Sequence, residues 1–381
     1  MHTQISIDNS DAIDREPLRQ IIIEHYGEFG SGGKSMSYQE RLALYQEIED
    51  LRGHPLICYV TSIRPYASGQ ISSDVIPEFI KQINEISEVH DEVDLLVASN
   101  GGDPNVAARI IGLLRERFNK VSVLLPYVAF SAATLMALGA DEIVMHPFSN
   151  LGPVDPQLVV TRSGQDGLLE TITYGVEDLR NYVAFVKSEV GISDQEQLAR
   201  AVEALCKEVG AVSIGVAKRS AHLTTSLGEK LLSLHIKDSG KAKIITETLS
   251  RSYYHHGYPV GRSEAKNIEL PVVDAPHDLE KAIWLVWEDL EKEMECNEVF
   301  NPITTVLNGP GASQLLDLGA QDVVTVPPMD YELFLATLES SRGRSELKKG
   351  GRITAMRQPD MNIVAGVIQL YEGWAYSKAS Q

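Results

Sequence analysis

The sequence predicts an α/β protein with a mostly parallel sheet, and two of its features carry this prediction. Short, continuously apolar segments such as 93–98 and 121–126 alternate with segments whose apolar residues recur at a helical period. Strands that are apolar on both faces are typical of a parallel sheet with helices on each side. The strand–helix order is that of βαβ units, so we expect a single α/β layer extending to about residue 275.

The elements follow from periodicity and from turn residues along the chain. The first half is expected to contain helices over 15–26, 38–51, 73–86 and 106–118, strands over 56–62, 93–98, 121–126 and 142–145, and a small-residue helix after Ser131. The second half is expected to contain a hairpin over 158–174, mostly helix over 178–256, a strong amphipathic helix over 278–295, and alternating antiparallel strands beyond 298. We therefore expect an N-terminal helical segment (1–54), an α/β domain (55–297) and a C-terminal β-rich unit (298–381).

The composition excludes some classes of function. Lys and Arg total 34 against 53 Asp and Glu, a net charge of −19, which repels phosphate backbones, so we expect no nucleic-acid partner. The three cysteines, Cys58, Cys206 and Cys296, fit no metal-ligand spacing, and a sparse, odd count favours a reducing compartment. The N-terminus has no signal-peptide pattern, and no apolar run approaches ~18 residues. We expect a cytoplasmic protein without a membrane span.

One segment suggests acyl-transfer chemistry. The strand over 93–98 ends in Asn100-Gly101-Gly102, and the next strand delivers Ser131 to the start of a helix. A serine at a strand-to-helix entry is a candidate nucleophile beside the positive helix end. The bare amides of a Gly-Gly turn can approach a substrate carbonyl, so Gly102 and Ala132 are the candidate oxyanion donors.

A serine nucleophile also needs a base that a third group orients. Asp155 lies in the tight turn 151–157, and His256 lies where a helix stops before Gly257 and Pro259, with His255 as a weaker alternative. A triad of Ser131, Asp155 and His256 is possible, because geometry and not chain order defines a triad. Plainer interpretations stay open: an N-cap for the serine, a turn residue for the aspartate, and a helix-end residue for the histidine.

The segments SNGGDPNVAARI, YVAFSAATLMALGADEIVM, SNLGPVDPQ and HHGYPVGRSEAK resemble the Clp-fold serine peptidases. More narrowly, they are similar to the serine dehydrogenase proteinase family, relatives of signal peptide peptidase A. The resemblance covers about residues 55–275. It implies a Clp/crotonase-type ββα spiral, the roles named above for Ser131, Asp155 and His256, and a homo-oligomer. The family usually has glycine two residues after the serine, where this chain has Ala133.

We therefore expect a serine endopeptidase that hydrolyses peptide or protein substrates through an acyl-enzyme, without a metal or organic cofactor. Signal peptide peptidases use a Ser–Lys dyad, which makes Lys187 an alternative base if it is desolvated. Two other classes share the fold. A crotonase-like enzyme would act on acyl-CoA thioesters, although the acidic balance disfavours a CoA phosphate site. A catalytically inactive scaffold would only bind peptides.

Overall fold

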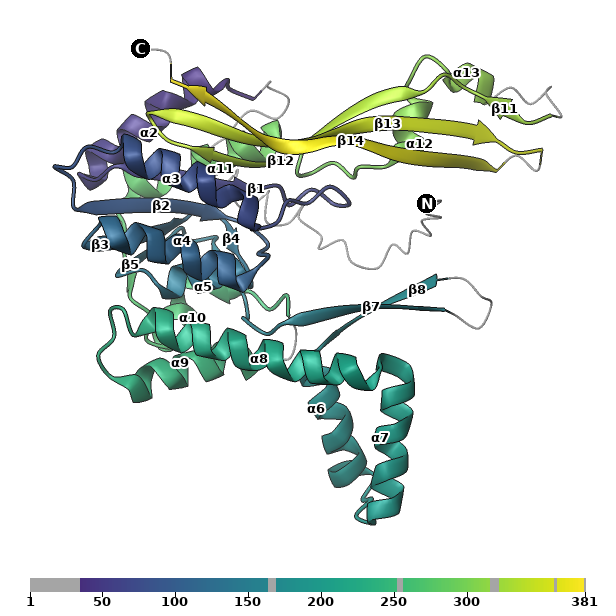
Figure 1. The fold of residues 1–381 in the computed structure, drawn as a ribbon. Coiled ribbons are helices and arrows are strands. Elements are labelled where there is room, and N and C mark those ends of the chain that lie inside the picture. The colour runs from purple at the N-terminus through teal and green to yellow at the C-terminus, as the bar shows by residue number, and fades with distance from the viewer. Residues whose placement is uncertain (1–34, 164–168, 252–255, 316–321, 360–361, 380–381) are drawn as a thin grey trace.

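The computed structural model describes residues 35–163, 169–251, 256–315, 322–359 and 362–379 (Figure 1). The helix expected over 15–26 lies outside the described residues, as does the tip of the hairpin at 164–168. The helix expected over 38–51 is present as α2 (Tyr38–Arg52). Ser37 caps it by accepting a hydrogen bond from the Glu40 amide, and Gly53 ends it in a left-handed conformation.

Five parallel strands form the centre of the main sheet. In order across the sheet they are β10 (Val272–Val273), β5 (Glu142–Met145), β3 (Lys120–Leu125), β2 (Glu92–Ala98) and β1 (Leu56–Thr61). All residues of β1, and all but the first of β2, are buried. The mostly parallel sheet that the apolar segments predicted is therefore confirmed.

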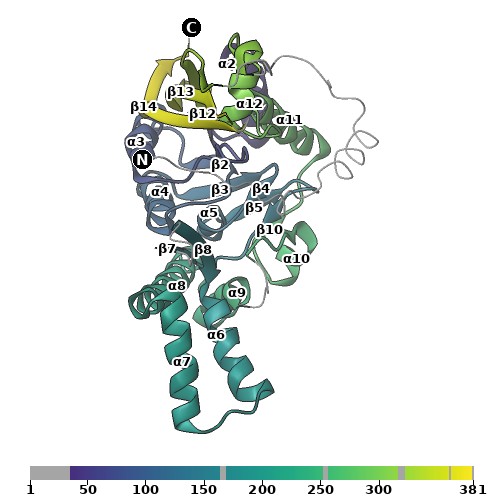
Figure 2. The ribbon, with the colours of Figure 1, turned by 90° about the vertical axis from the view of Figure 1, so that its right-hand side faces the viewer.

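Helices cover this sheet on both faces, because successive side chains of a strand point to opposite sides. One face carries η1 (Ser73–Val75), α3 (Ile76–Glu85), α4 (Pro104–Arg117) and α5 (Ala132–Leu138). Ile57, Tyr59, Leu95 and Val97 of the strands pack on that side. The other face carries α2 and α11 (His277–Glu293), which pack on residues such as Leu56 (Figure 2).

A second, small sheet lies beside the main one. It consists of β4 (Val128–Ala129), β6 (Asn150–Leu151) and β9 (Val260–Gly261). The pair β4–β6 is parallel and the pair β6–β9 is antiparallel. Three segments that are far apart in the sequence are therefore adjacent in space, and each carries one residue of the predicted triad near its end.

A hairpin and a group of helices project away from the main sheet (Figures 1 and 2). They are β7 (Gln157–Ser163), β8 (Leu169–Gly175), α6 (Val176–Ala184), the π-helical turn η2 (Phe185–Glu189), α7 (Gln195–Val209) and α8 (Ala211–Leu232). The chain then returns to the sheet through α9 (Ser239–Arg251) and α10 (Arg262–Asn267). The predicted hairpin and the mostly helical stretch are confirmed. No helix in the described part of the chain has the length and apolarity to cross a bilayer.

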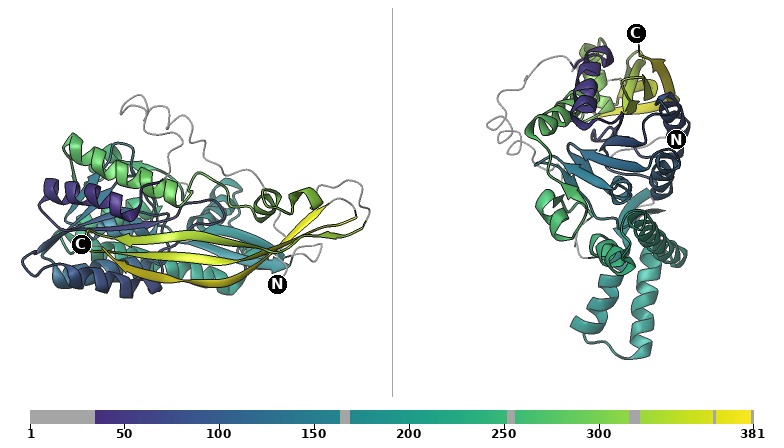
Figure 3. Two further views of the ribbon diagram at one scale, coloured as in Figure 1. Left: turned by 90° about the horizontal axis from the view of Figure 1, so that it is seen from above. Right: turned by 90° about the vertical axis from the view of Figure 1, so that its left-hand side faces the viewer.

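The C-terminal strands continue the main sheet. After α12 (Pro302–Leu307) and α13 (Ala312–Leu315) come β11 (Val324–Thr325), β12 (Met329–Glu339), β13 (Gly343–Arg357) and β14 (Ile363–Lys378). The predicted antiparallel strands are present, but β12 pairs antiparallel with β1, in register Cys58 to Glu339. Figure 3 shows them as a long ribbon that leaves the sheet. A boundary at 298 therefore does not separate two sheets, since this pairing joins them.

A buried ionic cluster connects these C-terminal strands to the N-terminal helix. Arg41 of α2 is fully buried and binds both carboxylate oxygens of Glu339, at 3.1 and 3.0 Å. Arg41 also pairs with Asp289 and Glu293 of α11, and the Tyr45 hydroxyl donates to Glu339 at 2.6 Å. Burial alone would raise the pKa of Glu339, but the cationic neighbours, Arg41 foremost, hold it below its ordinary value. The cluster therefore stays charged and ties α2, α11 and β12 together.

Candidate active site

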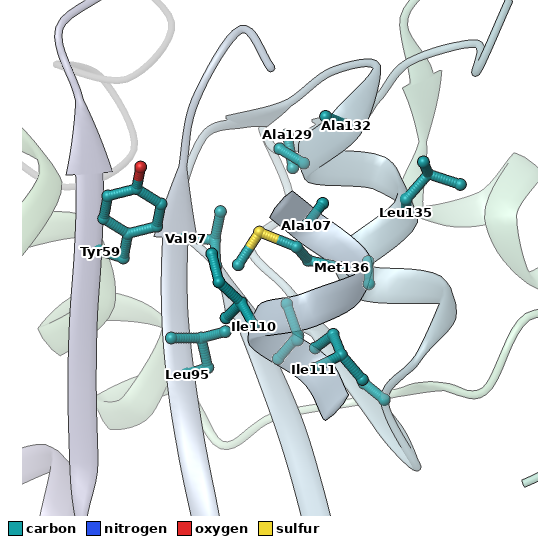
Figure 4. Close-up of a cluster of buried hydrophobic side chains, with 14 of the residues drawn as sticks. Tyr59, Leu95, Val97, Ala107, Ile110, Ile111, Ala129, Ala132, Leu135 and Met136 are labelled. Atoms are coloured by element: carbon teal, nitrogen blue, oxygen red, sulfur yellow. The ribbon is translucent and has the colours of Figure 1, made fainter. Parts of the chain in front are cut away.

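Ser131 occupies a strained turn between β4 and α5. Its backbone has φ 52° and ψ −116°, a conformation that residues with a side chain rarely adopt. Every residue of α5 is buried, and Ala132 lies above Val97 and Met136 in the apolar core (Figure 4). The small side chains let the helix enter deeply into the fold, whereas Ser131 itself stays partly exposed. This arrangement leaves the predicted nucleophile within reach of solvent at the start of a buried helix.

The Gly101-Gly102 turn lies directly against Ser131. The two glycines have φ 107° and 151°, values that favour glycine. A Cβ placed on Gly101 would lie 2.9 Å from the Cβ of Ser131 and 3.1 Å from the amide nitrogen of Ala132. A Cβ placed on Gly102 would overlap the backbone of Ile71, which pairs with the turn as an isolated bridge. Both glycines are therefore required by close backbone approach.

The amides of this turn differ in their hydrogen bonding. The Gly101 N–H donates to the Ser99 hydroxyl at 3.0 Å, and the Gly101 carbonyl accepts from the Ile71 amide at 2.8 Å. Among the described residues, the amides of Gly102 and Ala132 have no hydrogen-bond acceptor. Two unengaged backbone donors, one in the glycine turn and one directly after Ser131, meet one requirement of an oxyanion hole.

Asp155 and His256 form a hydrogen-bonded pair. The His256 Nδ1–H donates to Asp155 Oδ1 at 2.8 Å, and the two side chains are 24% and 15% exposed. In neutral imidazole this bond assigns the proton to Nδ1 and leaves Nε2 as an acceptor. Sequence reasoning selected both residues separately from their local turns, and the structure brings them together across 101 residues of chain.

The small sheet brings this pair to the Ser131 side of the fold. Ser131 follows β4 by two residues, Asp155 follows β6 by four, and His256 precedes β9 by four. The Thr134 hydroxyl reinforces the link between the first two segments. It lies 2.7 Å from the Ala129 carbonyl and 2.9 Å from the Gly152 carbonyl, and it accepts from the Gly152 amide at 3.1 Å. The nucleophile helix and the Asp155 turn are thereby held side by side.

Lys187 lies in η2, within the helical projection. Its side chain is exposed to solvent, so it lacks the buried surroundings that a lysine base requires. Figures 1 and 2 place α6 and α7 of this projection at the end of the molecule away from β4. His255 lies outside the described residues. Within the described ranges, no group of three or more His, Cys, Asp or Glu side chains is arranged to hold a metal ion.

Sequence reasoning did not single out Ser99, Thr61 or Thr134, although all three are fully buried and bond within this site. Two signals could have indicated them. A serine two residues before a glycine is a common pattern for side-chain bonding to a backbone amide. A lone threonine within an otherwise apolar helix needs a partner when buried.

Comparison with known proteins identifies a related family over part of this site. Residues 76–173 match the model of the ClpP-like SDH-type serine proteinase family. The resemblance to this serine proteinase family is therefore confirmed over a segment that includes Gly102, Ser131 and Asp155 and ends before His256.

Two uncharacterized proteins of Methanocaldococcus jannaschii are each 26% identical to the chain. One matches over 183 residues, 47% of this chain and 53% of the relative. The other matches over 180 residues, 47% of this chain and 51% of the relative. The chain thus spans about half the length of the curated relatives it matches.

Several solved structures are also similar. A mutant of the 1510-N membrane-bound stomatin-specific protease has 16% identity and a TM-score of 0.32, over 63% of this chain and 85% of its own. The ClpP catalytic domain of Plasmodium falciparum has 13% identity and a TM-score of 0.32, over 65% and 98%. A putative enoyl-CoA hydratase of Streptomyces coelicolor has 14% identity and a TM-score of 0.29, over 77% and 92%. None of these likenesses bears on activity.

Proposed function

We propose that this protein is a serine endopeptidase that cleaves peptide or protein substrates through an acyl-enzyme on Ser131. The observation that carries the proposal is the Asp155–His256 hydrogen bond, because both residues flank strands of the small sheet whose strand β4 leads into Ser131. A carboxylate that orients an imidazole near a serine is the arrangement that activates the hydroxyl. The strained turn and the two unengaged amides of Gly102 and Ala132 support the same chemistry.

Each of these groups has a defined role in the proposed mechanism. Nε2 of His256 removes the proton from the Ser131 hydroxyl as its oxygen attacks the substrate carbonyl carbon. The Gly102 and Ala132 amides donate to the oxyanion that forms, while Asp155 stabilises the imidazolium. The C–N bond then breaks, and the imidazolium protonates the leaving amine. Water, deprotonated by the same imidazole, hydrolyses the acyl-enzyme and regenerates the serine.

The central test is labelling by a fluorophosphonate probe, which reacts only with an activated serine. Wild-type protein should label at Ser131, and Ser131→Ala should abolish labelling without a change in unfolding midpoint. His256→Ala should slow labelling by orders of magnitude, whereas Lys187→Ala, a change of an exposed side chain, should leave the rate unchanged. Equal labelling of wild type and Ser131→Ala would contradict the proposal.

Labelling, together with two substrate assays, separates this proposal from the two other classes of protein. A peptide-binding scaffold would not label at all, because it lacks an activated serine. A crotonase-like enzyme would turn over acyl-CoA thioesters while leaving a fluorogenic peptide library intact. The proposed peptidase requires cleavage within the peptides of that library and loss of cleavage in Ser131→Ala.

We also propose that the protein assembles into homo-oligomers. Among the described strands, β14 pairs only with β13, so its other edge presents backbone donors and acceptors along 16 residues. It contains no proline, and Val364, Val367, Ile368 and Leu370 are all exposed. A long, apolar edge strand of this kind favours pairing with another strand. Light scattering coupled to size-exclusion chromatography tests the proposal, and a monomer at all accessible concentrations would contradict it.

A further inference from the structure

We propose that Ser99 is a positioning residue that sets the relative placement of the two oxyanion donors. This inference rests on the proposed function, because it assigns a role within the same site. Ser99 directly follows β2 and is fully buried. It touches no reacting atom in the proposed mechanism and acts only through its neighbours.

The Ser99 side chain is hydrogen-bonded to the glycine turn and to β1. Its hydroxyl oxygen accepts the Gly101 N–H at 3.0 Å and lies 2.7 Å from the Thr61 hydroxyl, which donates to it. Thr61 is the last residue of β1 and is also fully buried. The Gly101 amide is thereby engaged inside the protein, and the Gly102 amide is left without an internal acceptor. Ser99 therefore determines that the Gly101 amide, and not the Gly102 amide, is hydrogen-bonded inside the protein.

The Ser99 backbone is hydrogen-bonded to the segment that leads into Ser131 and Ala132. Its amide donates to the Val128 carbonyl at 2.9 Å, and its carbonyl accepts from the Phe130 amide at 2.9 Å. These two bonds form an isolated parallel bridge to β4, the strand that leads into Ser131. One residue thus joins the segment that carries Gly102 to the segment that carries Ala132.

Loss of the Ser99 hydroxyl should act on the transition state more than on probe binding. The buried Gly101 N–H would lose its acceptor, which favours rotation of the turn toward another partner. The Gly102 amide would then move from the point it shares with the Ala132 amide. Removal of a single oxyanion donor costs about 100-fold to 1,000-fold in turnover, and a displaced donor should cost a part of that.

The test measures fluorophosphonate labelling of the full-length protein as a function of probe concentration. Ser99→Ala should lower the limiting labelling rate constant by about 10-fold or more, with the half-saturating probe concentration changed less than about 2-fold. Thr246→Val is the matched control, because Thr246 is a fully buried residue of α9 whose hydroxyl, among the described residues, bonds only to the Ala242 carbonyl of its own helix. This control should label at the wild-type rate.

A pair of variants at Thr61 separates positioning from packing. Thr61→Val keeps the shape and removes the hydroxyl that donates to Ser99, whereas Thr61→Ser keeps the hydroxyl and removes a methyl group. Positioning requires slower labelling in Thr61→Val and near-normal labelling in Thr61→Ser, and this comparison also decides the matter if Ser99→Ala does not fold. Packing alone would produce the reverse order and would overturn the inference.

The outcomes also distinguish this inference from the proposed function. If the wild-type protein does not label at Ser131, the proposed function fails and the positioning role fails with it. If the wild type labels and Ser99→Ala labels at the same limiting rate, only the positioning role is overturned. A fall in the limiting rate that Thr61→Val shares and Thr61→Ser does not would support it.

Discussion

The strained main chain at Ser131 can be tested separately from the chemistry of its hydroxyl. With φ 52° and ψ −116°, Ser131 lies in a region that costs a residue with a Cβ about 1–3 kcal/mol. Glycine relieves this strain but loses about 0.5–1 kcal/mol through its greater freedom in the unfolded chain. We therefore expect Ser131→Gly to exceed Ser131→Ala in free energy of unfolding by about 0.5–2 kcal/mol.

Equilibrium unfolding in urea, followed by tryptophan fluorescence, measures this difference. Both variants lack the hydroxyl, so neither should react with a fluorophosphonate, and the comparison isolates the backbone. Ala204→Gly supplies the matched control, because Ala204 is exposed within α7, where the same chemical change should destabilise by about 1 kcal/mol. A Ser131→Gly variant that is less stable than Ser131→Ala would refute the assignment of strain to this turn.

Three further predictions concern charged and titratable groups. Asp155→Asn should slow fluorophosphonate labelling of Ser131 by about 1,000-fold to 10,000-fold, since an amide stabilises the wrong imidazole tautomer; an unchanged rate would contradict the orienting role. Burial lowers the pKa of His146 to about 3 in the folded protein. Because this histidine binds a proton below about pH 6.5 in the unfolded chain, acid favours unfolding, and the free energy of unfolding should fall by about 2 kcal/mol between pH 7 and pH 5. Urea titrations at pH 7 and 5 should show that His146→Asn reduces this loss and that the exposed His222→Asn does not. Arg41→Met should lower the free energy of unfolding by about 3–5 kcal/mol, because it leaves buried carboxylates uncompensated; a cost below 1 kcal/mol would contradict this account.

Local signals in the sequence were sufficient for most elements and for the choice of candidate residues. Apolar runs and helical periods predicted β1, β2, β3, α4 and α11 within a few residues of their observed bounds. Ser131, Asp155 and His256 were selected because each lies at a turn, and turn chemistry depends on residues that are close in the chain. The same logic could not choose between His256 and Lys187 as the base, since that choice depends on burial and on a partner far away in the sequence.

The sequence by itself therefore determined the α/β class, the order of the elements and the short list of reactive side chains, because these depend on contacts within a few residues. Only the tertiary structure decided which distant segments meet. The pairing of β12 with β1, the bond between Asp155 and His256, and the bridge from Ser99 to β4 each join parts of the chain through strand register. Register is set by the packing of whole faces against one another, and a one-residue shift would turn every side chain of a strand to the opposite face. No local pattern encodes that choice, and for this reason the buried hydroxyls beneath the site became visible only in the folded protein.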